Sequence, residues 1–277
     1  MIKSIINFFI GIIVSIIIGF ILYLAVYYSR PEDTSFNEGF WLVLNDVLQS
    51  NANNKGVGYF NHIVQTIIHF FIPFILSAIS GVSLGILFSL HKKVNTISNF
   101  FIDFLRVLPS IVFITLFKYN INVPNFFEKT IGIDFIDYLY LVVLIASVWP
   151  IIIATKEGVQ KVNSTSYMVI QQLNIPWWKK LKVFILPEAF PNIFNGIKIS
   201  IAIAFLIAVT CEYITPELNG LGALLKYYEN ISEGYYFHSI IVIISIGIVG
   251  LVINFTLEII ENKLSWLKNQ YKTNDFE

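Results

Sequence analysis

Long uninterrupted apolar runs constrain this chain most, because few folds can bury or cover them. A bilayer's hydrocarbon core of about 30 Å needs about 20 consecutive apolar residues per spanning helix. Six runs of roughly this length lie along the 277 residues, at 5–28, 63–90, 97–117, 138–155, 197–215 and 237–260. Each run is continuously apolar rather than alternating, which favours helices over barrel strands. We therefore predict an all-α fold, a polytopic bundle of six transmembrane helices.

The domain organisation follows from the same runs. Residues 1–60 comprise the first helix and an extracytoplasmic loop, residues 61–260 form the membrane core, and residues 261–277 form a cytoplasmic tail. The first run is too long for a signal-peptide core, and no small-residue cleavage pattern follows it, so we expect a retained helix.

Composition limits the function classes. Charged residues make up 13% of the chain, against about 25% in ordinary soluble domains. The net charge of +0 gives no reason to expect a nucleic-acid partner, and the single cysteine, Cys211, excludes an internal disulfide. The sequence contains neither a phosphate-binding loop nor a His-Glu-x-x-His zinc motif. We expect no enzymatic activity and no cofactor.

Lysine and arginine near the run ends predict orientation, because cytoplasmic loops retain positive charge. One side of the predicted membrane collects most of the lysines: Lys3, Lys92, Lys93, Lys156, Lys161, Lys179, Lys180, Lys182, Lys198, Lys263, Lys268 and Lys272. The other side carries most of the acids. Both termini are therefore predicted to be cytoplasmic.

The largest inside segment, residues 156–196, has its own helical spacing. Residues 162–173 and 179–184 show helical periodicity and are separated by Asn174-Ile175-Pro176. An ordered cytoplasmic loop of this length predicts a cytoplasmic partner.

A few residues inside the runs are candidates for function or packing. Glu212 lies near the outer end of the fifth run, where an ionised group is costly. One interpretation is that it lines a pathway or gate beside the Gly220-Leu221-Gly222 bend. The other is that its side chain reaches the outer surface. Asp103 and Arg106 can pair on one helical face, with Arg106 and Pro109 shaping the third run's inner end. Gly81 and Gly85 have Gly-x-x-x-Gly spacing, typical of close helix packing.

Several of these stretches resemble permeases of ATP-binding-cassette (ABC) importers. In that family's cytoplasmic loop a Glu-Ala-Ala triplet precedes a glycine and then an apolar-x-Leu-Pro ending. Here the triplet positions hold Met168, Val169 and Ile170, the glycine position holds Asn174, and the ending is Phe184, Leu186 and Pro187. The spacing is kept, whereas the acid and the glycine are replaced.

Three further stretches are similar to the nitrate/sulfonate/taurine type of this family. They are Arg106-Val107-Leu108-Pro109, the Thr155-x-x-Gly158-Val159 segment, and Glu212 followed by Gly220-Leu221-Gly222. The resemblance covers about residues 61–260. It implies inward passage of a small solute by alternating access, cytoplasmic ATPase subunits, an extracytoplasmic substrate-binding protein, a homodimer, and a place in the bacterial inner membrane.

Three other readings remain open at this stage. The chain is also compatible with an importer permease of the glycine betaine or methionine type. An ion-driven secondary carrier would need several intramembrane acids, for which only Glu212 and His69 are candidates. A membrane scaffold without transport activity would need no ATPase partner.

Overall fold

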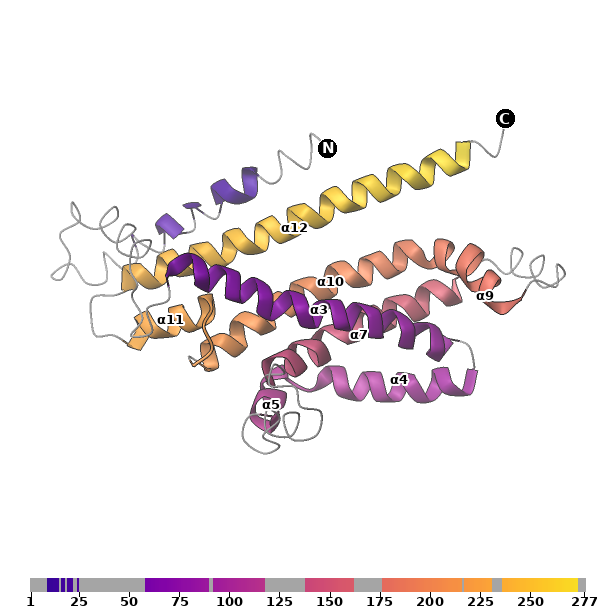
Figure 1. The fold of residues 1–277 in the computed structure, drawn as a ribbon, viewed down its shortest axis with the longest axis horizontal. Helices are drawn as coiled ribbons and strands as arrows, with labels where there is room; N and C mark the ends of the chain where they lie inside the picture. Colours follow the sequence, from indigo (N-terminus) through magenta and orange to yellow (C-terminus); the bar gives the residue numbers. More distant parts are fainter. Residues whose placement is uncertain are drawn as a thin grey trace. The chain divides into compact units, whose positions relative to one another are not determined.

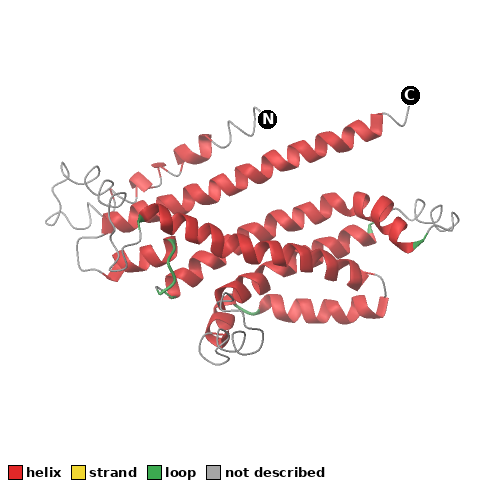
Figure 2. Cartoon of the chain, viewed as in Figure 1, coloured by secondary structure: helices red, strands yellow, loops and turns green. Residues whose placement is uncertain are grey.

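The computed structural model describes residues 9–14, 16–17, 19–21, 24, 58–89, 92–117, 138–161, 176–215, 217–230 and 236–273. Throughout these residues the regular secondary structure is helical (Figure 1), and the few described residues between helices are loops and turns (Figure 2). The chain divides into two compact units, residues 68–208 and residues 1–67 with 209–277.

The first of these units contains the middle of the chain. Its helices are the later part of α3 (Tyr59–Ser89), then α4 (Lys92–Val107), α5 (Ser110–Thr115), α7 (Tyr138–Gln160), α9 (Trp177–Lys180), the π-helical turn η2 (Leu181–Ile185) and most of α10 (Leu186–Ile214). Both α4 and α5 pack against α7. A small core of Ile102, Val148 and Ile152 joins α4 to α7.

The other unit brings the beginning of α3 and the end of α10 together with α11 (Leu221–Asn230) and α12 (Tyr236–Thr273). Its core contains Tyr59 from α3, Leu221, Leu224 and Tyr228 from α11, and Ile241 and Val242 from α12. The short helix α11 is therefore held between longer ones.

Among the described residues, four helices are long and apolar enough to span a membrane: α3, α7, Trp177–Ile214, and His238–Leu264 within α12. They expose many large apolar side chains; Ile79 and Leu206 are each 63% exposed. Such surfaces would aggregate in water and are normal against hydrocarbon. The predicted all-helical, polytopic membrane fold is confirmed. Half of the first run lies outside the described residues, and Phe9–Ile21 is an apolar helix where it is described.

The third run, which the sequence predicts as one continuous helix over 97–117, is interrupted in the structure. Helix α4 ends at Val107 and α5 begins at Ser110. Pro109 stands between them in an extended conformation, with φ −60° and ψ 134°. Proline lacks the N–H that a continuing helix needs and disfavours the helical region for the residue before it, so the helix stops at this position.

The fourth and fifth runs, by contrast, belong to helices longer than predicted. Helix α7 continues past Thr155 to Gln160, and the fifth helix begins at Trp177 rather than at Ile197. The second half of the predicted inside loop is therefore continuous with a spanning helix.

Two glycines in α3 allow α7 to approach closely. A Cβ built at Gly81 would lie 2.9 Å from Ile151 Cβ, and one built at Gly85 would lie 2.6 Å from Thr155 Cβ. Side-chain carbons do not come this close, so only glycine permits the observed packing. The Gly-x-x-x-Gly pair thus lies in a helix contact within the chain.

Candidate functional sites

A buried carboxylate occupies the end of α10. The Glu212 side chain is 0% exposed, as is Thr66 on α3. The Thr66 hydroxyl donates to Glu212 Oε2 over 2.9 Å, and the Gly222 backbone N–H donates to the same oxygen over 3.0 Å. An interfacial acid that reaches the outer surface would be exposed, so Glu212 does not take that arrangement.

These contacts cap the first turn of α11. The first N–H groups of a helix have no partner within the helix, and Gly220, just before α11, has no side chain to offer. Instead Leu221 N donates to Thr66 Oγ1 over 2.8 Å, while Gly222 N donates to Glu212.

Glycine is required at two positions here, by the Glu212 carboxylate at Gly220 and by the Val209 carbonyl oxygen, 2.2 Å from a built Cβ, at Gly222. Gly220 has φ 149°, which side chains with a Cβ rarely adopt, and a Cβ there would overlap the Glu212 carboxylate. A Cβ at Gly222 would lie 2.9 Å from Glu212 Cβ. The structure therefore brings together three residues singled out in the sequence: Glu212, Gly220 and Gly222.

A histidine from α3 completes this cluster. His62 is 1% exposed, and its Nδ1 lies 3.0 Å from both the N and the O of Gly220. A neutral ring with Nδ1 unprotonated accepts from Gly220 N–H, whereas a protonated Nδ1 donates to the carbonyl. His62 and Thr66 are four residues apart on one face of α3, so both reach the beginning of α11.

A smaller exposed cluster lies near this end of α10. The Tyr213 hydroxyl and Lys226 Nζ both donate to Glu229 Oε2, the lysine over 3.0 Å. The hydrogen bond from Tyr213 is the main cause that lowers the pKa of Glu229, and the bond to Glu229 raises the pKa of Lys226. Lys226 also lies 4.9 Å from the centre of the Tyr213 ring.

At its C-terminal end, α7 joins three helices. Thr155 packs against Gly85 of α3, and a Cβ at Gly158 would lie 2.9 Å from the Ala189 carbonyl oxygen of α10. Between them, Lys156 Nζ donates to Ser98 Oγ on α4 over 2.8 Å and also to Asn99 Oδ1. Thr155, Lys156 and Gly158 of the Thr-x-x-Gly segment therefore each contact a different helix, whereas Glu157 is exposed.

The end of the inside loop carries exposed aromatic and basic side chains. Trp178 is 77% exposed and Val183 58% exposed, and Lys179 and Lys182 are also exposed. Pro176, at the N-cap of α9, has an extended conformation with φ −60° and ψ 146°, and the helix begins at the next residue. The ending predicted from the family pattern follows: Phe184 lies in η2, and Leu186 and Pro187 begin α10.

Other predicted site residues are only partly placed. Met168, Val169, Ile170 and Asn174 lie outside the described residues. Arg106 belongs to α4, but its side chain is not among those described. Within the described part of the chain, no group of three His, Cys, Asp or Glu side chains converges to hold a metal ion.

Sequence reasoning missed Thr66, His62 and the contact of Lys156 with α4. Threonine is common in apolar helices, so Thr66 gives no signal by itself. The four-residue spacing of His62 and Thr66 was visible in the sequence. However, the partner of His62 lies 158 positions away along the chain, and the two partners of Thr66 lie 146 and 155 positions away. Only the fold reveals such pairs.

Comparison with known families decides the relationship. Residues 77–266 match the family of binding-protein-dependent transport system inner membrane components. The chain belongs to this family. The resemblance drawn from the sequence motifs is thereby confirmed.

Relatives in this inner-membrane component family are permeases for small anions. The chain is 29% identical over 183 residues to the bicarbonate transport system permease protein CmpB of Synechococcus elongatus, covering 65% of this chain and 60% of that protein. It is 25% identical to the nitrate import permease protein NrtB of Leptolyngbya laminosa, covering 82% and 76%. It is 26% identical to the putative aliphatic sulfonates transport permease protein SsuC of Bacillus subtilis, covering 77% and 72%.

A solved structure shows the same fold. The inward-facing MetNI methionine ABC transporter contains a chain that superposes with a TM-score of 0.61 at 14% identity, covering 83% of this chain and 99% of that one. The arrangement of helices in this family member is therefore one already seen in an ABC transporter.

Proposed function

We propose that this chain is the membrane-spanning permease subunit of an ATP-driven importer, and that it passes a small solute inward by alternating access. The family match over residues 77–266 carries this proposal. The chain itself is not an ATPase; separate cytoplasmic subunits bind and hydrolyse ATP.

The proposed coupling element is the inside loop, residues 156–196. Met168, Val169, Ile170 and Asn174 form the part seated on the ATPase, and the Phe184, Leu186 and Pro187 ending links it to the spanning helix α10. Support comes from the exposed Trp178 and Val183, which leave an apolar surface at this end of the helix. Because Trp177–Ile214 is one long helical stretch, a force applied to the loop acts on a spanning segment.

The proposed solute is a small anion or a related polar molecule, such as a nitrate-, sulfonate- or taurine-like compound, or a vitamin precursor. The similarity to permeases for bicarbonate, nitrate and sulfonates supports the anion class. A separate extracytoplasmic binding protein delivers the solute and sets most of the specificity. Two copies of the chain form the pathway, which lies in a bacterial inner membrane with both termini cytoplasmic.

We assign the Glu212 cluster to the outer gate. Glu212, Gly220 and Gly222 fix the beginning of α11, so a movement of α3 or α10 at this point moves α11 with it. Arg106 and Pro109 are further gate candidates, which shape the inner end of the third span. The supporting observation is the hydrogen-bonded connection of α3, α10 and α11 through one carboxylate.

Co-purification from native membranes tests the importer assignment. The tagged chain in mild detergent should retain an ATPase subunit in stoichiometric amount, with vanadate-sensitive ATP hydrolysis. Replacing Met168 and Ile170 by Asp should remove both. The matched control Asn230→Asp, an exposed substitution on α11, should retain them. A chain that purifies without an ATPase would contradict the importer assignment and favour a secondary carrier or a scaffold.

A further inference from the structure

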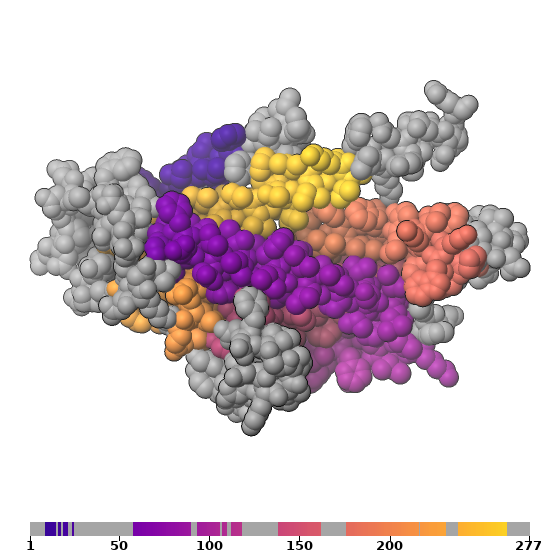
Figure 3. Space-filling model, viewed as in Figure 1, coloured from indigo at the N-terminus to yellow at the C-terminus, as the bar shows by residue number. Residues whose placement is uncertain are grey.

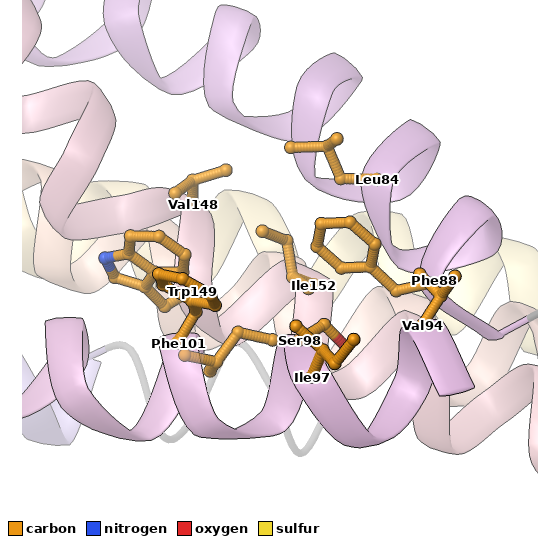
Figure 4. A pocket seen from close by; sticks show the side chains of 10 residues that line it. Leu84, Phe88, Val94, Ile97, Ser98, Phe101, Val148, Trp149 and Ile152 are labelled. Atoms are coloured by element: carbon orange, nitrogen blue, oxygen red, sulfur yellow. The ribbon is translucent and has the colours of Figure 1, made fainter. Parts of the chain in front are cut away.

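An apolar cavity of about 420 Å³ lies between α3, α4 and α7, within residues 68–208. Its wall includes Leu84 and Phe88 from α3, Val94 and Phe101 from α4, and Trp149 and Ile152 from α7 (Figure 4). Ser98 is the one polar side chain in the wall. The volume falls in the range of small-molecule sites, about 300–1,000 Å³.

The cavity reaches the outer surface of the spanning helices. Ile97 is 59% exposed and Phe101 58% exposed, and both line it. The later part of α3 and α4 form adjoining surface in the space-filling view (Figure 3). Both α3 and α7 are long enough to span a membrane, and hydrocarbon chains suit an apolar hollow between such helices better than water does.

One end of the cavity is basic. Lys156 lies two turns beyond Trp149 on α7 and binds Ser98, the polar side chain of the wall. Lys93 is exposed at the beginning of α4, next to the cavity residue Val94. With Asp103 of α4, the formal charges of these three side chains sum to +1.

The distance along α7 from Trp149, in the wall of the cavity, to Lys156, beyond the wall, lies within one leaflet. From Trp149 to Lys156, α7 rises about 10 Å at about 1.5 Å per residue. Half of a hydrocarbon core is about 15 Å. The wall is apolar beside Trp149 and the cations stand at the other end, which is the polarity of one phospholipid with its acyl chain toward the bilayer centre.

We propose that this cavity binds one acyl chain of an anionic phospholipid, whose headgroup lies at the end marked by the exposed Lys93. The bound lipid fills the space between α3, α4 and α7. Lipid composition then affects how α4 packs on α7. This inference depends only on the chain spanning a membrane, and it stands whether or not the importer assignment does.

Fluorescence quenching by brominated lipid tests this site. In the purified full-length chain, Trp41, Trp177, Trp178 and Trp266 are replaced by Phe, so that Trp149 is the only emitter. Vesicles contain phosphatidylglycerol or phosphatidylcholine with identical dibrominated chains. We expect saturable quenching of Trp149, half-complete at about fivefold lower mole fraction of phosphatidylglycerol, because one lysine near an anionic headgroup favours it by about this factor.

Matched variants separate the cavity from the general surface. Val94→Phe with Ile97→Phe should fill the cavity and remove the saturable component. Ile79→Phe, on an exposed face of α3 outside the cavity, should leave it unchanged. Lys93→Gln should retain saturation and lose most of the headgroup preference.

Two outcomes would overturn the proposal. Quenching that rises in proportion to mole fraction, equal for both headgroups and insensitive to the filling variants, would show ordinary contact with bulk lipid. A Trp149 that is not quenched would show that protein covers the cavity, either a second copy or another segment of the chain. Both results leave the co-purification test of the importer untouched.

Discussion

At the scale of single residues, the role of a buried carboxylate depends on the groups that donate hydrogen bonds to it. The sequence identified Glu212 because an acid in an apolar run is costly unless it is compensated. It did not identify Thr66, which supplies that compensation, because the pair is separated by 146 positions. The chemical type of a site residue is thus readable from one sequence, whereas its contacts require the fold.

Replacement of Glu212 should separate charge from hydrogen bonding. We expect Glu212→Ala to lower the free energy of unfolding by about 1–3 kcal/mol, because the Gly222 N–H and the Thr66 hydroxyl lose a buried acceptor. Glu212→Gln keeps an acceptor and should cost less than Glu212→Ala. Thermal unfolding in detergent measures both. Equal stability of the alanine variant and the unmodified chain would contradict the capping role.

The same variants also test the gate assignment. Glu212→Gln should reduce solute uptake in reconstituted vesicles while stability changes little. Wild-type uptake by this variant would remove Glu212 from the gate and leave it a purely structural cap.

Gly85 should tolerate no larger residue. The side chain of Gly85→Leu would enter the space of Thr155 and the Ile152 carbonyl, and overpacking of this kind costs about 1–3 kcal/mol. Gly247, on α12, has nothing within 4 Å of a built Cβ, so Gly247→Ala is the control. Thermal unfolding of the two variants should differ clearly. Similar melting temperatures would show that α3 and α7 can separate without cost.

At the scale of elements, helix existence was predictable and helix limits were not. The apolar runs locate α3, α7, α10 and α12 because twenty apolar residues have few alternatives in a membrane. Their ends depend on local chemistry: Pro109 interrupts the third run, and Trp177–Phe184 continues the fifth helix although it contains three lysines. The lysine stems can lie along apolar surface while their ammonium groups reach water. Hydropathy alone therefore places the beginning of this helix too late in the sequence.

Substitutions of Ser98 on α4 and of Lys156 on α7, which bond to each other, should lower the free energy of unfolding by different amounts. Ser98→Ala removes an acceptor from the buried Lys156 ammonium and should cost about 1–3 kcal/mol. Lys156→Met removes the buried charge itself and should be nearly neutral, because apolar replacement of a buried charge avoids its desolvation cost. Chemical unfolding of both variants tests this order. A larger loss from Lys156→Met would show that the charge itself is stabilising.

At the scale of the whole molecule, topology follows from charge. The lysine distribution predicts that both ends of the chain are cytoplasmic. Helix packing alone does not distinguish the two orientations, because the hydrocarbon core is the same from either face. Family membership, likewise, was accessible from the order of short motifs along the chain. The packing of α11 against the ends of α3 and α10 was not, because it depends on residues far apart in sequence.

Cysteine labelling should decide the orientation. Cys211 is 0% exposed, so the natural chain offers a nearly unreactive background. Lys3→Cys and Asn274→Cys should react with a membrane-permeant maleimide in intact cells and resist an impermeant one. Thr34→Cys, in the predicted outer loop, should react with both. Reaction of either terminal cysteine with the impermeant reagent would overturn the predicted topology.

The π-helical turn η2, between α9 and α10, has a consequence for how the exposed tryptophans face. A π-turn amounts to one extra residue inserted into an α-helix, and one residue corresponds to about 100° of rotation. The Trp177–Lys180 turn therefore has a different angular phase from the spanning part of α10 than an unbroken α-helix would give. Deleting one residue within 181–185 would rotate that turn about the helix axis and aim its rings at a different neighbour, with no change in composition on either side.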